Sequence, residues 1–149
     1  MNVEFEVEGF LQKLSEAENL VNKNLGKAVA DCCMKVQRTA QEGMTNTTID
    51  YSKIYYTHNK SIGHSPSNAG DYPAIDTGTL RRSISFSIEE NGGQVIGKVG
   101  STIKNPAYPL FLEYGTSKMK PRPWLRPSLN DNMEWIKERI KKAVREGVK

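Results

Sequence analysis

Hydrophobic residues recur every three or four positions over residues 8–42, which predicts one long amphipathic helix. Gly43 follows this pattern and is the expected stop of the helix. Cys32 falls on the apolar stripe, which favours a small buried side chain over a reactive thiol. The members of the stripe are Phe10, Leu14, Ala17, Val21, Leu25, Ala28, Cys32 and Val36, widened by Leu11, Leu20 and Val29.

The helical period disappears over residues 44–75, which are rich in Asn, Ser, Thr, Gly and Pro. A connection of this length is usually functional or disordered in a compact domain. Tyr51, Tyr55, Tyr56 and Tyr72 lie within it, and tyrosine offers contact area at low entropic cost. The segment is therefore expected either to dock on a partner or to contribute an irregular strand to the domain's own sheet.

A period of two begins at Leu80, where Leu80, Arg82, Ile84, Phe86 and Ile88 fall on one face of a predicted strand. The sequence ENGG at 90–93 predicts a hairpin turn, and 94–101 predicts the returning strand. Gly97 and Gly100 on the second strand indicate a bulge or a close backbone approach.

The last third of the chain predicts a short helix ending at Gly115, a rigid Pro-rich connector and a final helix over 127–146 that starts with Pro127. The order of elements predicts an α+β fold, in which a long N-terminal and a C-terminal helix pack on a small antiparallel sheet. The length of 149 residues fits a single domain spanning 1–149. The expected inner stripe of the final helix is Leu129, Met133, Ile136, Ile140 and Val144.

Charge is unevenly distributed along the chain. Residues 118–149 carry ten basic and four acidic side chains, whereas residues 1–42 carry five and seven. A basic segment can bind nucleic acid, although the signs alternate along KERIKKAVREGVK as they do on a solvated helix face. DNA binding by residues 118–149 therefore stays open as an alternative.

The opening sequence MNVEFEVEG alternates acidic and apolar residues, unlike a secretory signal, and no stretch approaches the ~20 apolar residues of a membrane span. No contact with a membrane is expected. The adjacent Cys32 and Cys33 suit a reducing compartment. We therefore expect the chain to function in the cytoplasm where it is made.

Asp76-Thr77-Gly78 is the tripeptide that carries the catalytic aspartate of aspartic proteases. That mechanism needs two carboxylates about 3 Å apart, so one copy per chain requires a symmetric dimer. The alternative is structural: Asp76 and Thr77 accept backbone N–H groups in a tight turn, Gly78 takes positive φ, and Asp76 is placed to pair with Arg81 or Arg82. The residues around the tripeptide favour the turn and no enzyme activity, with a dimeric protease as the unfavoured alternative.

Neither a metal nor another cofactor is expected. His58 and His64 are the only histidines, both lie in the polar loop, and no cysteine is near them. The chain has no Gly-rich phosphate loop and no pattern that points to a small-molecule substrate.

Four segments, DTGTLRRSI, GKVGS, YPLFLEYGT and PRPWLRPSL, precede a final helix in this order. Together they resemble the tail-component family of long-tailed bacteriophages, small neck proteins that complete the tail and join it to the head. The resemblance covers residues 70–149, with Trp124 where Phe is usual and Ser128 where Ala is usual. The matching positions are Asp76, Thr77, Gly78, Leu80, Arg81, Ser83 and Ile84; Glu113, Tyr114, Gly115 and Thr116; and Pro121, Pro123, Trp124, Leu125, Arg126 and Pro127.

The resemblance implies a non-enzymatic structural subunit of the virion, assembled in the cytoplasm of the bacterial host. Members of the family form rings, typically hexamers, on the phage axis. The implied partners are further copies of the chain, the head connector or adaptor, and the tail terminator or tube proteins, with phage DNA passing through the lumen.

A ring subunit needs surface residues that contact its neighbours. Trp124 and Arg126, held on a Pro-braced segment, are of the residue types that dominate interface energetics, although Trp124 could instead cover its own core. Glu113 is expected to pair with Arg81, Arg82 or Arg126, within or between subunits. The remaining interface candidates are Tyr114, Trp135, which is expected to be half exposed, and Tyr51, Tyr55 and Tyr56.

Overall fold

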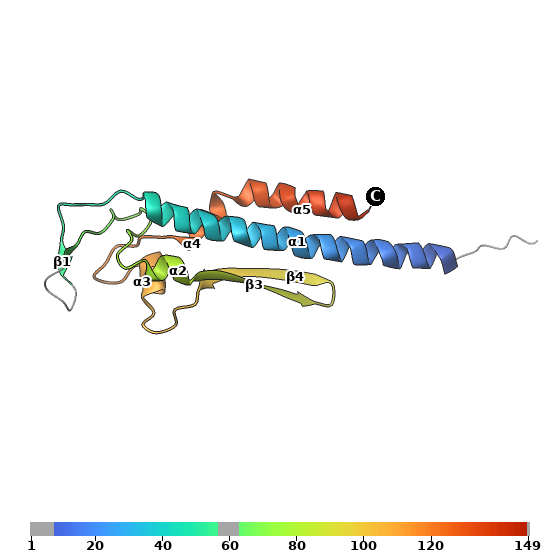
Figure 1. Cartoon of the computed structure of the whole chain (residues 1–149), viewed down its shortest axis with the longest axis horizontal. Coiled ribbons are helices and arrows are strands. Elements are labelled where there is room, and N and C mark those ends of the chain that lie inside the picture. Colours follow the sequence, from blue (N-terminus) through green and yellow to red (C-terminus); the bar gives the residue numbers. More distant parts are fainter. Residues whose placement is uncertain (1–7, 57–62, 149) are drawn as a thin grey trace, which may run out of the picture.

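The computed structural model describes residues 8–56 and 63–148, with the side chains of residues 8–11, 55 and 56 left out of the description. Its axis is one long helix, α1 (Glu8–Asn46). Figure 1 shows the last helix, α5 (Met133–Gly147), on one side of α1, and the hairpin of β3 (Ile84–Asn91) and β4 (Gln94–Ser101) on the other. The predicted α+β fold is confirmed, although α5 packs on α1 rather than on the sheet.

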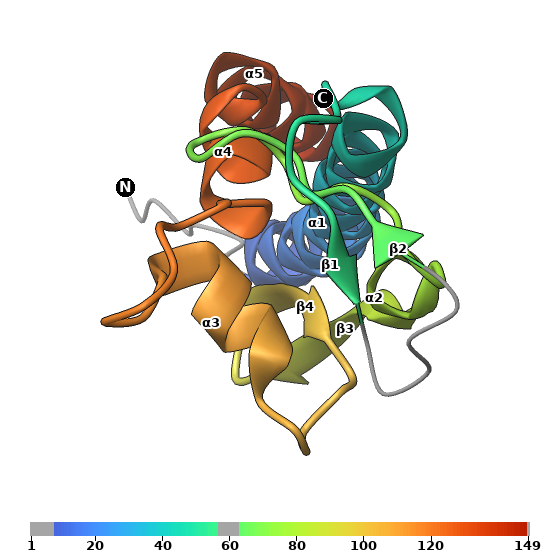
Figure 2. The ribbon, with the colours of Figure 1, turned by 90° about the vertical axis from the view of Figure 1, so that its left-hand side faces the viewer.

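Short elements gather around the end of α1 that leads into residue 47, as the end-on view in Figure 2 shows. They include the two-residue strands β1 (Tyr55–Tyr56) and β2 (Gly63–His64), which pair antiparallel with each other and stay apart from the β3–β4 sheet. Three short helices complete this end: α2 (Thr79–Ser83), α3 (Tyr108–Tyr114) and α4 (Leu125–Asn130).

The β3–β4 hairpin has a continuous register from Ile84 opposite Ser101 to Asn91 opposite Gln94, without a bulge. Gly92 and Gly93 form its two-residue turn at φ 54° and 85°, a conformation that favours glycine at both positions. The predicted strand start at Leu80 is wrong, because residues 79–83 form the helical turn α2 and the alternation holds only from Ile84 onward. There the buried Ile84 and the partly buried Phe86 and Ile88 alternate with exposed residues, so their shared inner face is confirmed.

β4 approaches α1 closely at Gly97. A Cβ added there would lie 2.7 Å from Cγ1 of Val29 and closer still to Sγ of Cys33. The predicted close approach is therefore confirmed for Gly97, whereas nothing lies within 4 Å of the corresponding position on Gly100.

Small residues let α5 pack tightly against α1 in the antiparallel direction. Ala28 and Ala143 are completely buried, and a Cβ on Gly147 would come within 2.6 Å of Cγ2 of Val21. Arg139 reinforces the contact by donating two hydrogen bonds to Oδ2 of Asp31, at 2.7 and 2.9 Å.

The predicted final helix 127–146 is in fact two helices, α4 and α5, separated at Asp131 and Asn132. The amide Nδ2 of the buried Asn132 donates to Oγ1 of Thr39 and to the carbonyl of Ser128, both at 2.8 Å, and so fixes the bend. The inner stripe predicted for one continuous helix is therefore partly wrong. Leu129 and Val144, expected inside, are exposed, and Ala143 and Gly147 are buried instead.

Gly43 does not end α1, which continues to Asn46. The side of the helix at Gly43 is covered by the ring of Tyr72, since an added Cβ would lie 2.5 Å from Cδ1 of that ring. Glycine here makes room for an aromatic side chain from the loop, rather than stopping the helix. The neighbouring core cluster consists of Ala40, Met44, Leu80, Ile84 and Trp124.

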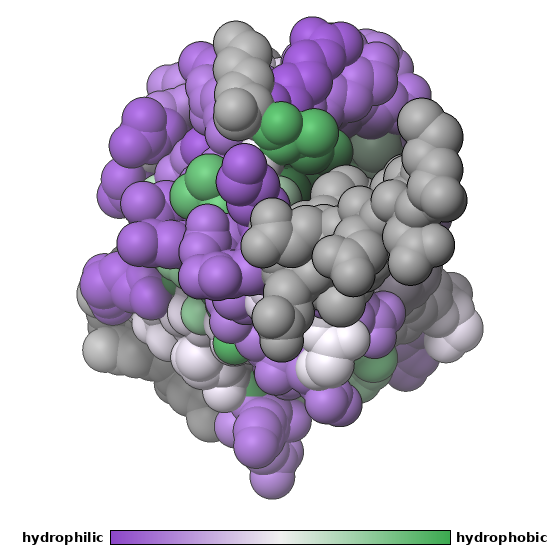
Figure 3. All heavy atoms as spheres, turned by 90° about the vertical axis from the view of Figure 1, so that its right-hand side faces the viewer, coloured by the Kyte–Doolittle hydropathy of each residue, from purple (hydrophilic) through white to green (hydrophobic). Residues whose placement is uncertain are grey.

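The opposite end of the molecule, where α5 finishes, has a mostly hydrophilic surface in Figure 3, with a few hydrophobic side chains gathered near the top of the view. Val148, directly after α5, is exposed, as are Leu14 and Leu20 on the first turns of α1. Within the described residues, no helix is both long and apolar enough to cross a lipid bilayer.

Candidate functional site

The Asp76-Thr77-Gly78 tripeptide forms a turn that leads into α2. Gly78 has φ 74°, and its carbonyl accepts a hydrogen bond from the backbone N–H of Arg82 at 3.0 Å. Oγ1 of Thr77 lies 2.7 Å from Oγ1 of Thr79 and also accepts from the backbone N–H of Thr79 at 3.4 Å. The predicted turn with positive φ at Gly78 is confirmed.

The carboxylate of Asp76 has a partner that the sequence did not predict. Oδ1 of Asp76 lies 2.6 Å from Nδ1 of His64, which β2 brings alongside the turn. The expected pairing of Asp76 with Arg81 or Arg82 is therefore wrong. Two segments separated in sequence are joined here by a partly exposed contact between an imidazole and a carboxylate.

Leu80 and Ser83, which were predicted as motif residues, serve the core and its junction with the hairpin. Leu80 is buried in the core cluster. The hydroxyl of Ser83 donates to the carbonyl of Leu80 at 2.7 Å and lies 2.7 Å from the hydroxyl of Ser101 at the end of β4. The side chain of Arg81, in contrast, lies on the exposed side of α2.

The carboxylate of Glu113 binds backbone N–H groups at the start of α4. Its Oε2 accepts hydrogen bonds from the N–H groups of Trp124 at 2.8 Å and Leu125 at 2.9 Å, and its Oε1 accepts from that of Arg126 at 3.0 Å. Glu113 is only 8% exposed, and the backbone N–H groups it binds have no partner within α4. The predicted pairing with an arginine guanidinium is wrong; we call this arrangement the Glu113 bracket.

Trp124 is a core residue. It is 3% exposed, and its indole Nε1–H donates to the carbonyl of Pro109 at 3.1 Å. The prediction that Trp124 is a surface anchor for a neighbouring subunit is therefore wrong, and the alternative, that it covers its own core, is confirmed. The Pro-rich segment holds the indole inward against α3, since the Glu113 bracket fixes its backbone.

Two residues that pack near Trp124 and Gly43 carry no sequence signal that points to their role. Tyr72 packs on Gly43 and its hydroxyl lies 3.1 Å from that of Ser128, which is completely buried. Ser128 also donates a hydrogen bond to the carbonyl of Trp124. The Tyr-rich loop thus contributes one tyrosine to the fold itself, and burial raises the pKa of Tyr72 above its usual range.

The outer side of α3 carries exposed hydrophobic residues, which we call the α3 face: Leu110, Phe111 and Tyr114, with Arg126 beside them. All four side chains are exposed. The guanidinium carbon of Arg126 lies 5.1 Å from the centroid of the Tyr114 ring, within the range of a cation–π contact. Tyr114 and Arg126 therefore remain interface candidates, brought together on one surface.

The other predicted interface residues lie apart from the α3 face. Trp135, on α5, is 43% exposed, so its predicted half exposure is confirmed. Tyr51 lies five residues after the end of α1 and is exposed. Tyr55 and Tyr56 form β1, and their side chains lie outside the described residues. The candidates are therefore spread over separate parts of the molecule.

A concave pocket of about 930 Å³, which we call the end pocket, opens beside α2 and α3. Its apolar lining comes mainly from Met44, Ile49, Pro73, Leu80 and Leu112, and its polar lining from His64, Ser67, Asp76, Arg81, Lys118 and Arg122. The pocket therefore lies between the 44–75 segment and the connector from α3 to α4.

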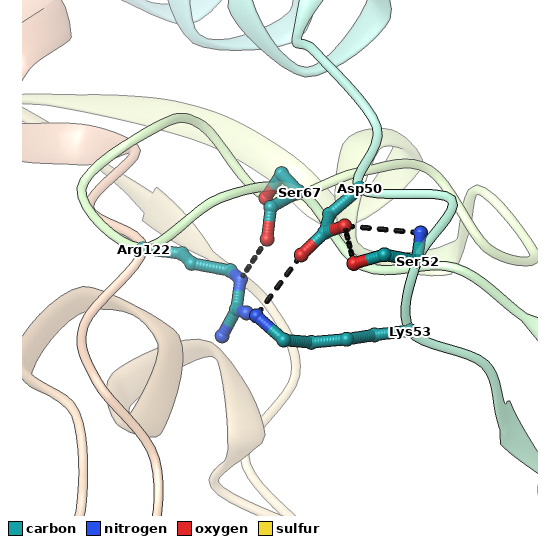
Figure 4. Close-up of polar contacts among 5 residues, drawn as sticks. All are labelled: Asp50, Ser52, Lys53, Ser67 and Arg122. Carbon is teal, nitrogen blue, oxygen red and sulfur yellow. Dashed lines mark hydrogen bonds and ion pairs between the residues drawn. The ribbon is translucent and has the colours of Figure 1, made fainter.

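The loops around the end pocket are held by polar contacts, drawn in Figure 4. Nε of Arg122 donates to the carbonyl of Ser67 at 3.0 Å, and Nζ of Lys53 lies 3.0 Å from Oδ2 of Asp50. The hydroxyl and backbone N–H of Ser52 donate to the same Asp50 carboxylate, and these bonds, with Lys53, lower the pKa of Asp50 to about 2. Within the described residues, the hydroxyl of Ser67, a residue 1% exposed, has no hydrogen-bond partner.

Most basic side chains of α5 form ion pairs. Lys137, Lys141 and Lys142 each form an ion pair with a glutamate three or four residues away, and Arg139 pairs with Asp31 of α1. Alternating signs along this helix therefore give a solvated face of mixed charge, which weakens its attraction for DNA.

Cys32 and Cys33 are both buried, and burial is the largest cause of the raised pKa of each thiol. The interpretation of Cys32 as a small buried hydrophobe is confirmed. In the part of the chain that the structure describes, no three His, Cys, Asp or Glu side chains gather as they would around a metal ion, and His58 lies outside that part.

Comparisons of the chain with models of protein families, with curated proteins and with solved structures found no match.

Proposed function

We propose that this chain is a non-enzymatic structural subunit of a bacteriophage or prophage virion, which completes the tail and joins it to the head connector through ring-forming contacts. The segments that carry the resemblance support this proposal by contributing to one packed unit. DTGTLRRSI supplies Leu80 and Ile84 to the core, YPLFLEYGT supplies Glu113, and PRPWLRPSL supplies Trp124. These segments share the role of making the end of the molecule around Trp124 rigid.

The observation that carries the proposal is the α3 face. It combines exposed aliphatic, aromatic and arginine side chains on a short helix that the Glu113 bracket locks to the core. Tyrosine and arginine are enriched where interface energy is concentrated, and rigid presentation lowers the entropic cost of binding. No catalytic machinery is needed for a surface of this kind.

A ring also needs a second, different surface, because head-to-tail contacts join unlike patches of neighbouring copies. The side of α5 that carries Trp135 meets this need, and Figure 2 shows α5 and α3 on different sides of α1. The partners of the subunit are then further copies of itself, the head connector and the tail terminator or tube.

The test is to disrupt this reading frame in the phage or induced prophage that encodes it. We expect electron microscopy of the lysate to show filled heads and complete tails that are not joined, and the wild-type gene to restore joined particles. Complementation with the double variant Phe111→Ser and Tyr114→Ser should fail, although both residues are exposed and the fold is kept. Complementation with Lys104→Ala, an exposed position before α3, is the matched control.

Joined, infectious particles at the wild-type level without the gene would contradict the proposal. A purified chain that binds DNA tightly, with an affinity falling steeply as salt rises, would instead favour the nucleic-acid-binding alternative. A cleavage activity that Asp76→Asn abolishes would favour the protease.

A further inference from the structure

The lining of the end pocket combines positive charge with apolar side chains. Arg81, Lys118 and Arg122 line it against a single carboxylate, Asp76, which is already paired with His64. Among the described residues, none of the three cations has an ion-pair partner. A pocket of this composition fits a ligand that is both apolar and anionic.

The buried hydroxyl of Ser67 also points to an occupant. Ser67 lines the end pocket and is 1% exposed, and its hydroxyl lacks a hydrogen-bond partner among the described residues. A buried polar group without a partner is costly, and a polar group of a bound peptide would relieve that cost.

The chain itself contains a segment with the complementary chemistry. Residues 2–7, NVEFEV, alternate Val3, Phe5 and Val7 with Glu4 and Glu6. In an extended peptide successive side chains point to opposite sides, so this sequence offers an apolar edge and an acidic edge. The apolar edge matches the apolar lining of the pocket, and the acidic edge matches the cationic lining.

Chain geometry excludes docking of this segment into the pocket of its own copy. Glu8 begins α1, whereas Met44, near the other end of α1, lines the pocket. At about 1.5 Å per residue these positions lie about 54 Å apart along the helix. Six extended residues reach only about 20 Å, so the occupant must come from another copy.

We propose that residues 2–7 of one copy dock in the end pocket of the next copy. The contact joins unlike ends of two molecules, which is the heterologous type of contact from which rings are built. The inference rests on the proposed ring and names one of its contacts. Its strength in a ring is raised by the high effective concentration of tethered neighbours, so weak binding of the isolated segment is sufficient.

The test titrates the full-length ¹⁵N-labelled chain with a synthetic peptide of residues 1–8 and records amide chemical shifts. We expect saturable shifts in the residues that line the end pocket, with a dissociation constant on the order of 100 μM. A peptide with Phe5→Ser tests the apolar edge and should bind at least about tenfold more weakly.

Charge reversal makes the test specific. The peptide with Glu4→Lys and Glu6→Lys should lose binding to the wild-type chain and regain it with the double variant Arg81→Glu and Lys118→Glu, whose substituted residues are both exposed. The double variant Lys35→Glu and Lys104→Glu changes the net charge equally, away from the pocket, and should bind the wild-type peptide as before.

An absence of shifts at millimolar peptide, shifts that map to the α3 face, or an equal loss in the control variant would overturn the inference. The outcome is independent of particle joining. Joined particles that need this gene, together with a failed titration, would leave the proposed function standing and remove only this contact. A successful titration with no defect in particle joining would leave this contact between copies standing and remove the proposed role in joining heads to tails.

Discussion

The two halves of α1 share one hydrophobic period but differ in what covers it. In the later half, Ala28, Val36, Ala40 and Met44 are all buried. In the opening half, Leu14 is 57% and Leu20 is 46% exposed, although both lie on the same predicted stripe. Hydrophobic periodicity therefore locates the apolar face of this helix without telling whether the chain returns to cover it.

The later half is covered because distant segments come back to it. Tyr72 reaches Gly43 from the long loop, Trp124 arrives from the Pro-rich connector, and the Glu113 bracket fixes that connector. Along the opening half, Gly147 at the end of α5 packs against Val21. Stability is thus concentrated at one end of the molecule, and substitutions there should have the largest effects.

Replacing Trp124 by alanine should have the largest effect. Removing a buried indole that also donates to the carbonyl of Pro109 is expected to lower the free energy of unfolding by about 3–5 kcal/mol. Urea unfolding followed by circular dichroism measures this change. Trp135→Ala is the matched control and should cost less than about 1 kcal/mol, because that indole is half exposed. Equal losses for the two variants would refute a core role for Trp124.

The Glu113 bracket should be the next most sensitive feature. Glu113→Gln keeps the shape but removes the charge and one acceptor oxygen, so the backbone N–H groups of residues 124–126 are no longer all satisfied. We expect a loss of about 1–3 kcal/mol in the free energy of unfolding. Glu134→Gln, at an exposed position on α5, should change it by less than about 0.5 kcal/mol. A bracket variant as stable as this control would show that α4 does not depend on the carboxylate.

Much of the fold was predictable because local physics decides it. The period of α1, the alternation after Ile84, the Gly92-Gly93 turn and the positive φ of Gly78 each depend on neighbouring residues. The end of the short helix at Gly115 belongs to the same group, since glycine adopts its φ of 77° without strain.

The errors arose where a distant contact decides the outcome. Gly43 has the composition of a helix stop, but the ring of Tyr72 gives it a packing role. Glu113 has the charge of an arginine partner, yet backbone N–H groups eleven to thirteen residues away bind it. Asn132 breaks the last helix through a hydrogen bond to Thr39, 93 positions earlier. Such pairings are specified only when the chain is folded.

The candidate site was predictable only in part for the same reason. Sequence patterns identified Tyr114, Arg126 and Trp135 as surface candidates, and all three are exposed. Sequence patterns could not distinguish Trp124 from these exposed candidates, because an aromatic residue between prolines is compatible with a surface contact and with the core alike. Sequence patterns also singled out the 44–75 segment and the turn at residues 76–78, which line the end pocket, but no local pattern shows that Leu112, Lys118 and Arg122 complete that lining.

Substitution in the opening half of α1 should have the smallest effect. The double variant Leu14→Gln and Leu20→Gln is expected to change the free energy of unfolding by no more than about 0.5 kcal/mol, because both side chains are already solvated and glutamine is nearly as good a helix former as leucine. Urea unfolding at low protein concentration measures it, with Val36→Gln in the buried half as the destabilising counterpart. A loss above about 1 kcal/mol that grows with protein concentration would mean that a second copy covers this half, and the contrast between the two halves would then hold only for the isolated chain.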